Sequence, residues 1–63
     1  GCSLDLDGDG KIQLSTDGVI ATRLMAGLTG NAVLANATAA SATRTTWAEL
    51  APYLSACKLL PSP

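Results

Sequence analysis

Four of the chain's five acidic residues, Asp5, Asp7, Asp9 and Asp17, fall within one short stretch. The first three alternate with other residues in the pattern D-x-D-x-D-G. Carboxylates at this density repel one another, so the segment is stable only when a cation joins them. The pattern therefore predicts a metal loop over residues 5–17, and the glycines within it exclude a regular helix or strand there.

Calcium suits this loop because it is a hard cation that takes six to eight oxygen ligands. The expected ligands of one Ca²⁺ are the carboxylates of Asp5, Asp7, Asp9 and Asp17 and the backbone carbonyl of Lys11. Gly10 permits the sharp bend of an EF-hand loop, and Gln13 is placed to hold a bridging water. We expect Ile12 to point inward and join the loop to the core.

The end of the loop departs from the EF-hand pattern. A standard loop has glutamate at its twelfth position, which is Thr16 here, and the nearest carboxylate is Asp17, one residue later. Either the loop bulges by one residue so that Asp17 ligates, or water and Thr16 complete the coordination. We favour the bulge. The short side chain of Asp17 indicates modest affinity, in the range of extracellular calcium sites.

Three other readings of the loop compete with calcium. Asp-Gly pairs also form ordinary turns, although a turn does not need three alternating aspartates. The Asp5-Leu6-Asp7-Gly8 stretch resembles the nucleophile motif of haloacid-dehalogenase phosphatases, but that motif needs a preceding buried strand and a large sheet. Magnesium is a weaker candidate, because a cage made of protein oxygens favours calcium.

Cys2 and Cys57 lie near the two ends of a chain of 63 residues, whose core is marginal at this size. Free thiols and a zinc site are the alternatives to a disulfide, but zinc lacks further soft ligands, since the chain has no histidine. A disulfide would contribute roughly 4 kcal/mol by restricting the unfolded chain. It indicates an oxidising compartment, so we expect a secreted protein, extracellular or periplasmic.

Helical periodicity accounts for most of the remaining chain, which predicts an all-α fold of two to three short helices. The first helix is expected over about 16–27, where Ile20, Leu24 and Leu28 recur every four residues with Met25 beside them. A short helix, capped by Asn31, is expected over about 31–36. The segment 35–45 has no clear pattern.

The last helix is expected over about 46–58. Thr46 and Glu49 form the sequence signature of a capping box. The apolar stripe of this helix consists of Trp47, Leu50, Leu54 and Cys57, and Pro52 interrupts its hydrogen-bond ladder.

Composition excludes several classes of function. A net charge of −1 argues against nucleic-acid binding, and no apolar run is long enough to span a membrane. The absence of histidine and the commitment of the carboxylates to a metal argue against an enzyme. We expect a monomer.

Two stretches of the chain resemble a known family. The loop Asp5–Gly10, followed by Thr16–Ile20, resembles the F-hand half of dockerin domains, which use paired calcium loops to bind cohesins in secreted cellulosomal proteins. The stretches Cys2–Asp5 and Ala42–Trp47 are similar to dockerin-like modules of bacterial secreted proteins. The resemblance implies one dockerin-like, EF-hand-like domain over 1–63, although a dockerin has two loops and this chain shows one.

The leading hypothesis is therefore a small extracellular module that calcium stabilises. The alternative is a dockerin-type module that recognises a protein partner of the cohesin kind. In that case the recognition surface would lie beside the loop, around Ser15, Thr16, Val19 and Arg23.

Overall fold

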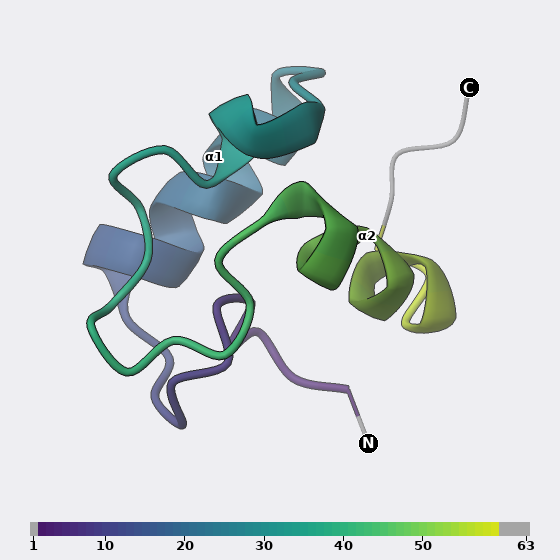
Figure 1. Cartoon of the computed structure of the whole chain (residues 1–63). Helices are drawn as coiled ribbons and strands as arrows, with labels where there is room; N and C mark the ends of the chain where they lie inside the picture. The colour runs from purple at the N-terminus through teal and green to yellow at the C-terminus, as the bar shows by residue number, and fades with distance from the viewer. Residues whose placement is uncertain (1, 60–63) are drawn as a thin grey trace.

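The computed structural model describes residues 2–59 and is all-helical, with no strand in that part of the chain, as predicted. The elements are the π-helical turn η1 (Leu14–Gly18), helix α1 (Val19–Met25), the 3-10 helix η2 (Gly30–Val33) and helix α2 (Trp47–Ala56). Figure 1 shows the N-terminal loop lying beside the connection that leads into α2. The predicted domain also includes residues 1 and 60–63, which lie outside the described residues.

The first helix starts earlier than predicted, with a different geometry. The Gly18 N–H donates to the Gln13 carbonyl, five residues earlier, at 3.2 Å, which is the spacing of a π-helical turn. The chain becomes α-helical only from Val19. The extra residue of the predicted loop is thus accommodated in η1.

The first helix also ends earlier than predicted, in a Schellman motif. Gly27 adopts a left-handed φ of 90°, and the Leu28 N–H donates to the Arg23 carbonyl at 3.0 Å. The chain leaves the helical path at this point, so the four-residue repeat cannot bring Leu28 to the core. Leu28 is 44% exposed and Met25 is 80% exposed, and the expectation that both join the apolar face was wrong.

One core joins α1, η2 and α2 to the N-terminal loop. Ile20 and Leu24 of α1 and Leu50 and Leu54 of α2 are buried, as their helical spacing predicts. The complete set of buried apolar side chains is Leu6, Ile20, Leu24, Val33, Leu34, Ala37, Leu50 and Leu54. Leu6 brings the N-terminal loop into contact with this core.

Helix α2 begins as predicted and ends two residues earlier. The Thr46 hydroxyl accepts the Glu49 N–H, and the Glu49 carboxylate accepts the Thr46 N–H, which confirms the capping box. Pro52 lies inside the helix. Lys58 has a left-handed φ of 56°, so the helical conformation stops before it.

The connection between α1 and α2 contains a shorter helix than the predicted 31–36. Asn31 does not cap this helix, because Thr29 occupies the N-cap position of η2. Instead the Asn31 side-chain oxygen accepts the Trp47 N–H at 2.7 Å and ties η2 to the start of α2. The Arg23 guanidinium donates to the carbonyls of Ala32, Val33 and Ala35, which satisfies the carbonyls at the end of η2.

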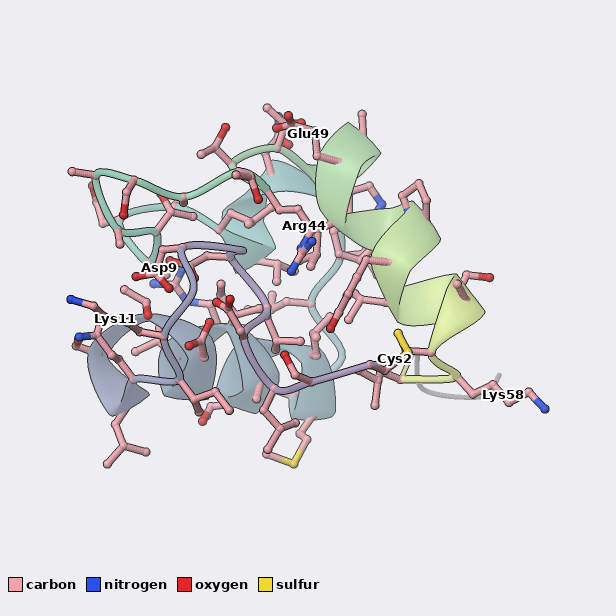
Figure 2. The ribbon with its side chains drawn as sticks, turned by 90° about the horizontal axis from the view of Figure 1, so that it is seen from below. Cys2, Asp9, Lys11, Arg44, Glu49 and Lys58 are labelled. Carbon is pink, nitrogen blue, oxygen red and sulfur yellow. A yellow bond between two sulfur atoms is a disulfide. The ribbon has the colours of Figure 1, made fainter. Side chains whose placement is uncertain are left out.

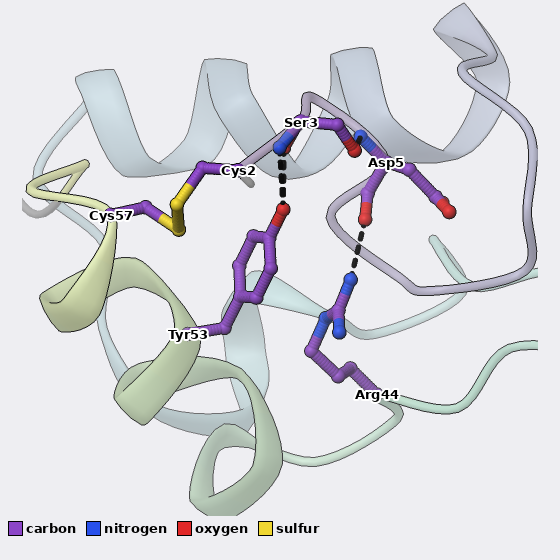
Figure 3. The surroundings of a disulfide bond; sticks show 6 residues. All are labelled: Cys2, Ser3, Asp5, Arg44, Tyr53 and Cys57. Carbon is purple, nitrogen blue, oxygen red and sulfur yellow. Dashed lines mark hydrogen bonds between the residues drawn. A yellow bond between two sulfur atoms is a disulfide. The ribbon is translucent and has the colours of Figure 1, made fainter.

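A Cys2–Cys57 disulfide joins the N-terminal segment to the end of α2, as predicted. Beside it, the Tyr53 hydroxyl donates to the Ser3 carbonyl and accepts the Ser3 N–H, both at 2.8 Å. Figure 3 shows these links together with Arg44. Within residues 2–59 no helix has the length and apolar character that crossing a bilayer requires.

Candidate metal centre

The carboxylates of Asp5, Asp7, Asp9 and Asp17 meet at one place. Each offers an oxygen, and these atoms all lie within 4.8 Å of one another. Three come from the loop and Asp17 comes from η1, where the π-helical turn places it one residue beyond the usual end of an EF-hand loop. The four aspartates are called the aspartate cluster below.

The Asp17 carboxylate holds the loop closed by accepting hydrogen bonds from two separate parts of it. Its Oδ1 accepts the Asp7 N–H at 3.2 Å and its Oδ2 accepts the Gln13 N–H at 2.9 Å. The side chain is 3% exposed, so the carboxylate is held in a fixed position. The neighbouring Thr16 side chain is also buried, and its Oγ1 has no hydrogen-bond partner.

Asp5 and Asp9 shape the tip of the loop. The Asp5 carboxylate accepts the N–H groups of Asp9 and Gly10 at 3.2 and 2.8 Å, and Asp9 accepts the Lys11 N–H at 2.9 Å. Desolvation raises the pKa of Asp5, but the Gly10 N–H, the Asp7 side chain and the Asp9 N–H together outweigh it and hold the pKa below its usual value. Asp5 therefore stays ionised while it folds the tip.

Asp7 is the least expected member of the aspartate cluster, because its side chain is fully buried. Its Oδ2 accepts the Ala39 N–H at 2.8 Å, whereas its Oδ1 has no partner within the described residues. Desolvation raises the pKa of Asp7; the Ala39 N–H opposes this, and the negative charge of Asp17 adds to it. A buried carboxylate oxygen without a donor is costly, and a cation among the four carboxylates would satisfy it.

The connection before α2 holds the loop from the other side. The Asp7 carbonyl accepts the N–H groups of Thr43 and Arg44, both at 2.9 Å. The Arg44 guanidinium donates to the carbonyls of Leu6 and Asp5 at 2.8 and 2.7 Å (the latter bond is drawn in Figure 3). It also lies over the Tyr53 ring, 3.8 Å from the ring centre. The loop is therefore fixed to the rest of the fold through its backbone, which leaves the carboxylates to face one another.

Gly8 is required where the loop meets this connection. Its φ of 71° lies in the left-handed region, and its carbonyl accepts the Thr43 hydroxyl at 2.9 Å. A Cβ at Gly8 would overlap with the Thr43 hydroxyl and come within 3.2 Å of the Arg44 guanidinium. No side chain fits at this contact.

The structure brings together four of the five ligands predicted from sequence and leaves the fifth untested. The Lys11 side chain is exposed, and its backbone carbonyl as a ligand stays a prediction. The inward orientation expected of Ile12 was wrong, since this side chain is 64% exposed. The sequence analysis did not predict a role in the site for Ala39 or Arg44. The one signal for Arg44 was the Ala42–Trp47 stretch, which was noted only for its similarity to dockerin-like modules, and Ala39 had no signal.

Part of the surface predicted for a cohesin-like partner is engaged in internal contacts, and the partner itself stays a prediction. Thr16 is buried, Val19 packs against the core, and Arg23 is bound to three carbonyls. Ser15 is exposed, and Val19 and Arg23 are half-buried. Comparison with known proteins adds no assignment, because no protein-family model, curated protein or solved structure matches the chain.

Proposed function

We propose that this chain is a calcium-binding module whose fold one bound Ca²⁺ stabilises. The observation that carries the proposal is the buried, unpartnered Oδ1 of Asp7 within the aspartate cluster. Four carboxylates with a carbonyl and a water approach the number of oxygens that calcium prefers. A smaller Mg²⁺ ion demands stricter octahedral geometry and keeps more of its own water, so calcium is the better match.

The ion would stabilise the fold because the aspartate cluster joins distant parts of the chain. Asp7 contacts Ala39 through its side chain and the 43–44 segment through its carbonyl. Neutralising the mutual repulsion of the carboxylates removes the force that opens the loop. Calcium at about 100 times its dissociation constant would add about 2.7 kcal/mol to the free energy of unfolding.

A thermal melt with the disulfide intact tests the proposal. We expect calcium at about 100 times its dissociation constant, which is about 10 mM or more for a site of extracellular affinity, to raise Tm by about 10–20 °C over a chelated sample, with a smaller effect of magnesium at the same concentration. Isothermal titration should give a stoichiometry of one. An unchanged midpoint, or equal effects of the two cations, would contradict calcium stabilisation.

We also propose that the module is dockerin-like and works in an oxidising environment outside the cytoplasm. Support comes from the Cys2–Cys57 disulfide, since such bonds persist mainly in secreted and periplasmic proteins. The modest calcium affinity expected of Asp17 is consistent with calcium-rich surroundings. Fractionation of the producing cells, followed by alkylation of free thiols, tests the location. An unbridged protein recovered from the cytoplasm would contradict it.

A further inference from the structure

The disulfide and the aspartate cluster lie at the two ends of one short N-terminal segment. Ser3 and Leu4 separate Cys2 from Asp5, the first member of the aspartate cluster. Ser3 and Leu4 are both exposed, so this segment buries little apolar surface of its own. In Figure 2, Arg44 lies between Cys2, beside the end of α2, and Asp9, at the tip of the loop. The position of the segment therefore depends on the bonds that hold it to the rest of the fold.

The Tyr53 hydroxyl holds the middle of this segment. It donates to the Ser3 carbonyl and accepts the Ser3 N–H, both at 2.8 Å (Figure 3), and the Ser3 hydroxyl accepts the Asp5 N–H at 3.2 Å. Tyr53 and Cys57 belong to the same turn at the end of α2, since the Cys57 N–H donates to the Tyr53 carbonyl at 3.0 Å. The disulfide thus brings Ser3 to the turn of α2 that bears this hydroxyl.

Arg44 connects Tyr53 to the loop. Its guanidinium lies 3.8 Å from the centre of the Tyr53 ring. The same guanidinium donates to the carbonyls of Leu6 and Asp5 at 2.8 and 2.7 Å, and the Asp5 carboxylate belongs to the aspartate cluster. A continuous series of contacts therefore runs from the disulfide, through Tyr53 and Arg44, to a carboxylate of the cluster.

We propose that the Cys2–Cys57 disulfide controls the calcium affinity of the aspartate cluster, acting through Tyr53 and Arg44. This proposal rests on the calcium binding proposed above. In the oxidised chain Ser3 is held on Tyr53, and Asp5 is held where the cluster needs its carboxylate. In the reduced chain the segment gains freedom that it must lose again when calcium binds, which lowers the affinity. Calcium is therefore retained in oxidising surroundings and released where thiol reductants are abundant.

A soluble dithiol opens the bond by thiol–disulfide exchange. Its thiolate attacks the sulfur of Cys2, which is exposed whereas Cys57 is half-buried, and the Cys57 thiolate leaves. The second thiol of the reductant then displaces Cys2 from the mixed disulfide. The products are two protein thiols and the oxidised, cyclic reductant, so that two electrons and two protons pass to the chain. Reoxidation by the reverse exchange restores the bond and the affinity.

The coupling works in both directions. A bond that raises the calcium affinity is itself protected from reduction by bound calcium, and by the same factor. Couplings between distinct sites usually amount to about 5–150-fold, and we expect about tenfold here. For a two-electron couple, a tenfold effect lowers the reduction potential of the disulfide by about 30 mV.

Calcium titrations of the oxidised and the reduced protein test the proposal. Isothermal titration with Ca²⁺ alone is run on the oxidised chain and on the chain kept reduced by dithiothreitol, while circular dichroism follows the helical content of both. We expect the reduced chain to bind calcium about tenfold more weakly. The reciprocal measurement equilibrates the protein in dithiothreitol redox buffers, with calcium or with chelator, and counts free thiols by alkylation. We expect calcium to lower the reduction midpoint by about 30 mV.

Tyr53→Phe separates this route from a general loss of stability. The variant keeps the disulfide and the ring beside Arg44 but removes the hydroxyl that holds Ser3. We expect its oxidised form to bind calcium several-fold more weakly than the unmodified chain. The difference between its oxidised and reduced forms should shrink to about twofold, because the hydrogen bonds that carry the coupling are lost. Ser55→Ala is the matched control, since it removes a hydroxyl from an exposed position of the same helix and should leave the coupling unchanged.

The outcomes distinguish the two proposals. An oxidised chain that binds no calcium would refute the calcium proposal, on which this one rests. Calcium binding with equal affinity in both redox states, or a reduction midpoint that calcium does not move, would overturn the coupling alone. Undiminished coupling in Tyr53→Phe would also overturn it, because the bond would then act through overall stability. A reduced chain that stays unfolded at saturating calcium would overturn it as well, since the bond would then be needed for folding itself.

Discussion

Replacement of Asp7 by asparagine separates the two roles that the structure gives this side chain. Its Oδ2 accepts the Ala39 N–H, and its Oδ1 faces the cluster without a partner. Asparagine has nearly the same shape, and its carbonyl oxygen keeps the bond to Ala39, but it removes one negative charge. We expect opposite effects on stability with and without calcium.

Without a cation, Asp7→Asn should stabilise the fold. Unit charges at the 4.8 Å limit of the aspartate cluster repel by about 3.5 kcal/mol at an effective dielectric of about 20. Because Asp5 and Asp9 are partly exposed to solvent, screening reduces the relief to about 1–2 kcal/mol. Each kcal/mol corresponds to about 4–8 °C in Tm for a domain of this size.

With calcium the order of the two proteins should reverse. The unmodified chain gains about 2.7 kcal/mol at 100 times its dissociation constant, whereas a variant with about 100-fold weaker affinity gains only about 0.4 kcal/mol. The unmodified chain then exceeds Asp7→Asn by about 0.3–1.3 kcal/mol. Thermal melts of both proteins, followed by circular dichroism in chelator and in calcium, would show the crossing.

Glu49→Gln is the matched control, because it removes one charge outside the aspartate cluster and retains a capping side chain. Its gain from calcium should equal that of the unmodified chain. If Asp7→Asn instead lowers Tm by the same amount in both conditions, the carboxylate acts only as a hydrogen-bond acceptor. The reasoning about the cation would then be wrong.

The other predictions concern the contacts around the loop and the cap of α2, each measured by thermal melts in chelator. Gly8→Ala should cost about 3 kcal/mol, since its methyl group overlaps with the Thr43 hydroxyl, while Gly10→Ala, with open space around it, should cost only about 1 kcal/mol; equal costs would rule out the clash. Arg44→Lys should lose about 2 kcal/mol, because an ammonium cannot make both carbonyl bonds and the aromatic contact; a change near zero would contradict this. Hydrogen bonds, led by that from the Thr45 N–H, lower the pKa of Glu49 below 4.5. The ionised Glu49 carboxylate therefore stabilises the fold above pH 4.5, and this contribution disappears as the pH falls through the lower pKa of the folded state. The stability difference between the unmodified chain and Glu49→Gln should shrink over that range.

Local patterns predicted the parts of this fold that depend on local physics. The capping box of α2 and the burial of Ile20 and Leu24 in α1 and of Leu50 and Leu54 in α2 follow from spacing alone, because neighbours three and four residues apart share a helix face. The cluster of Asp5, Asp7 and Asp9 follows from their alternation around a tight turn. The disulfide was the favoured of the alternatives for the two cysteines, because zinc lacks further ligands and a core of this size needs additional stabilisation.

Long-range contacts explain what the sequence patterns did not predict. The Arg44 side chain reaches the loop only because the connection before α2 lies against it. These hydrogen bonds join residues 38–39 positions apart, and no local spacing predicts them. The Schellman motif at Gly27 overrode the apolar repeat that continues to Leu28. Ile12 was placed inward by analogy with an EF-hand, yet in residues 2–59 no second loop is present for it to pack against.

The disulfide has a mechanical consequence. Cys2 and Cys57 have Cα atoms 5.8 Å apart although 55 positions separate them in sequence. A pulling force applied to the chain outside these two residues would pass through the sulfur–sulfur bond and leave the segment between them unloaded. The aspartate loop and all four helical elements would keep their shape under tension, and only reduction of the bond would expose them to stretching.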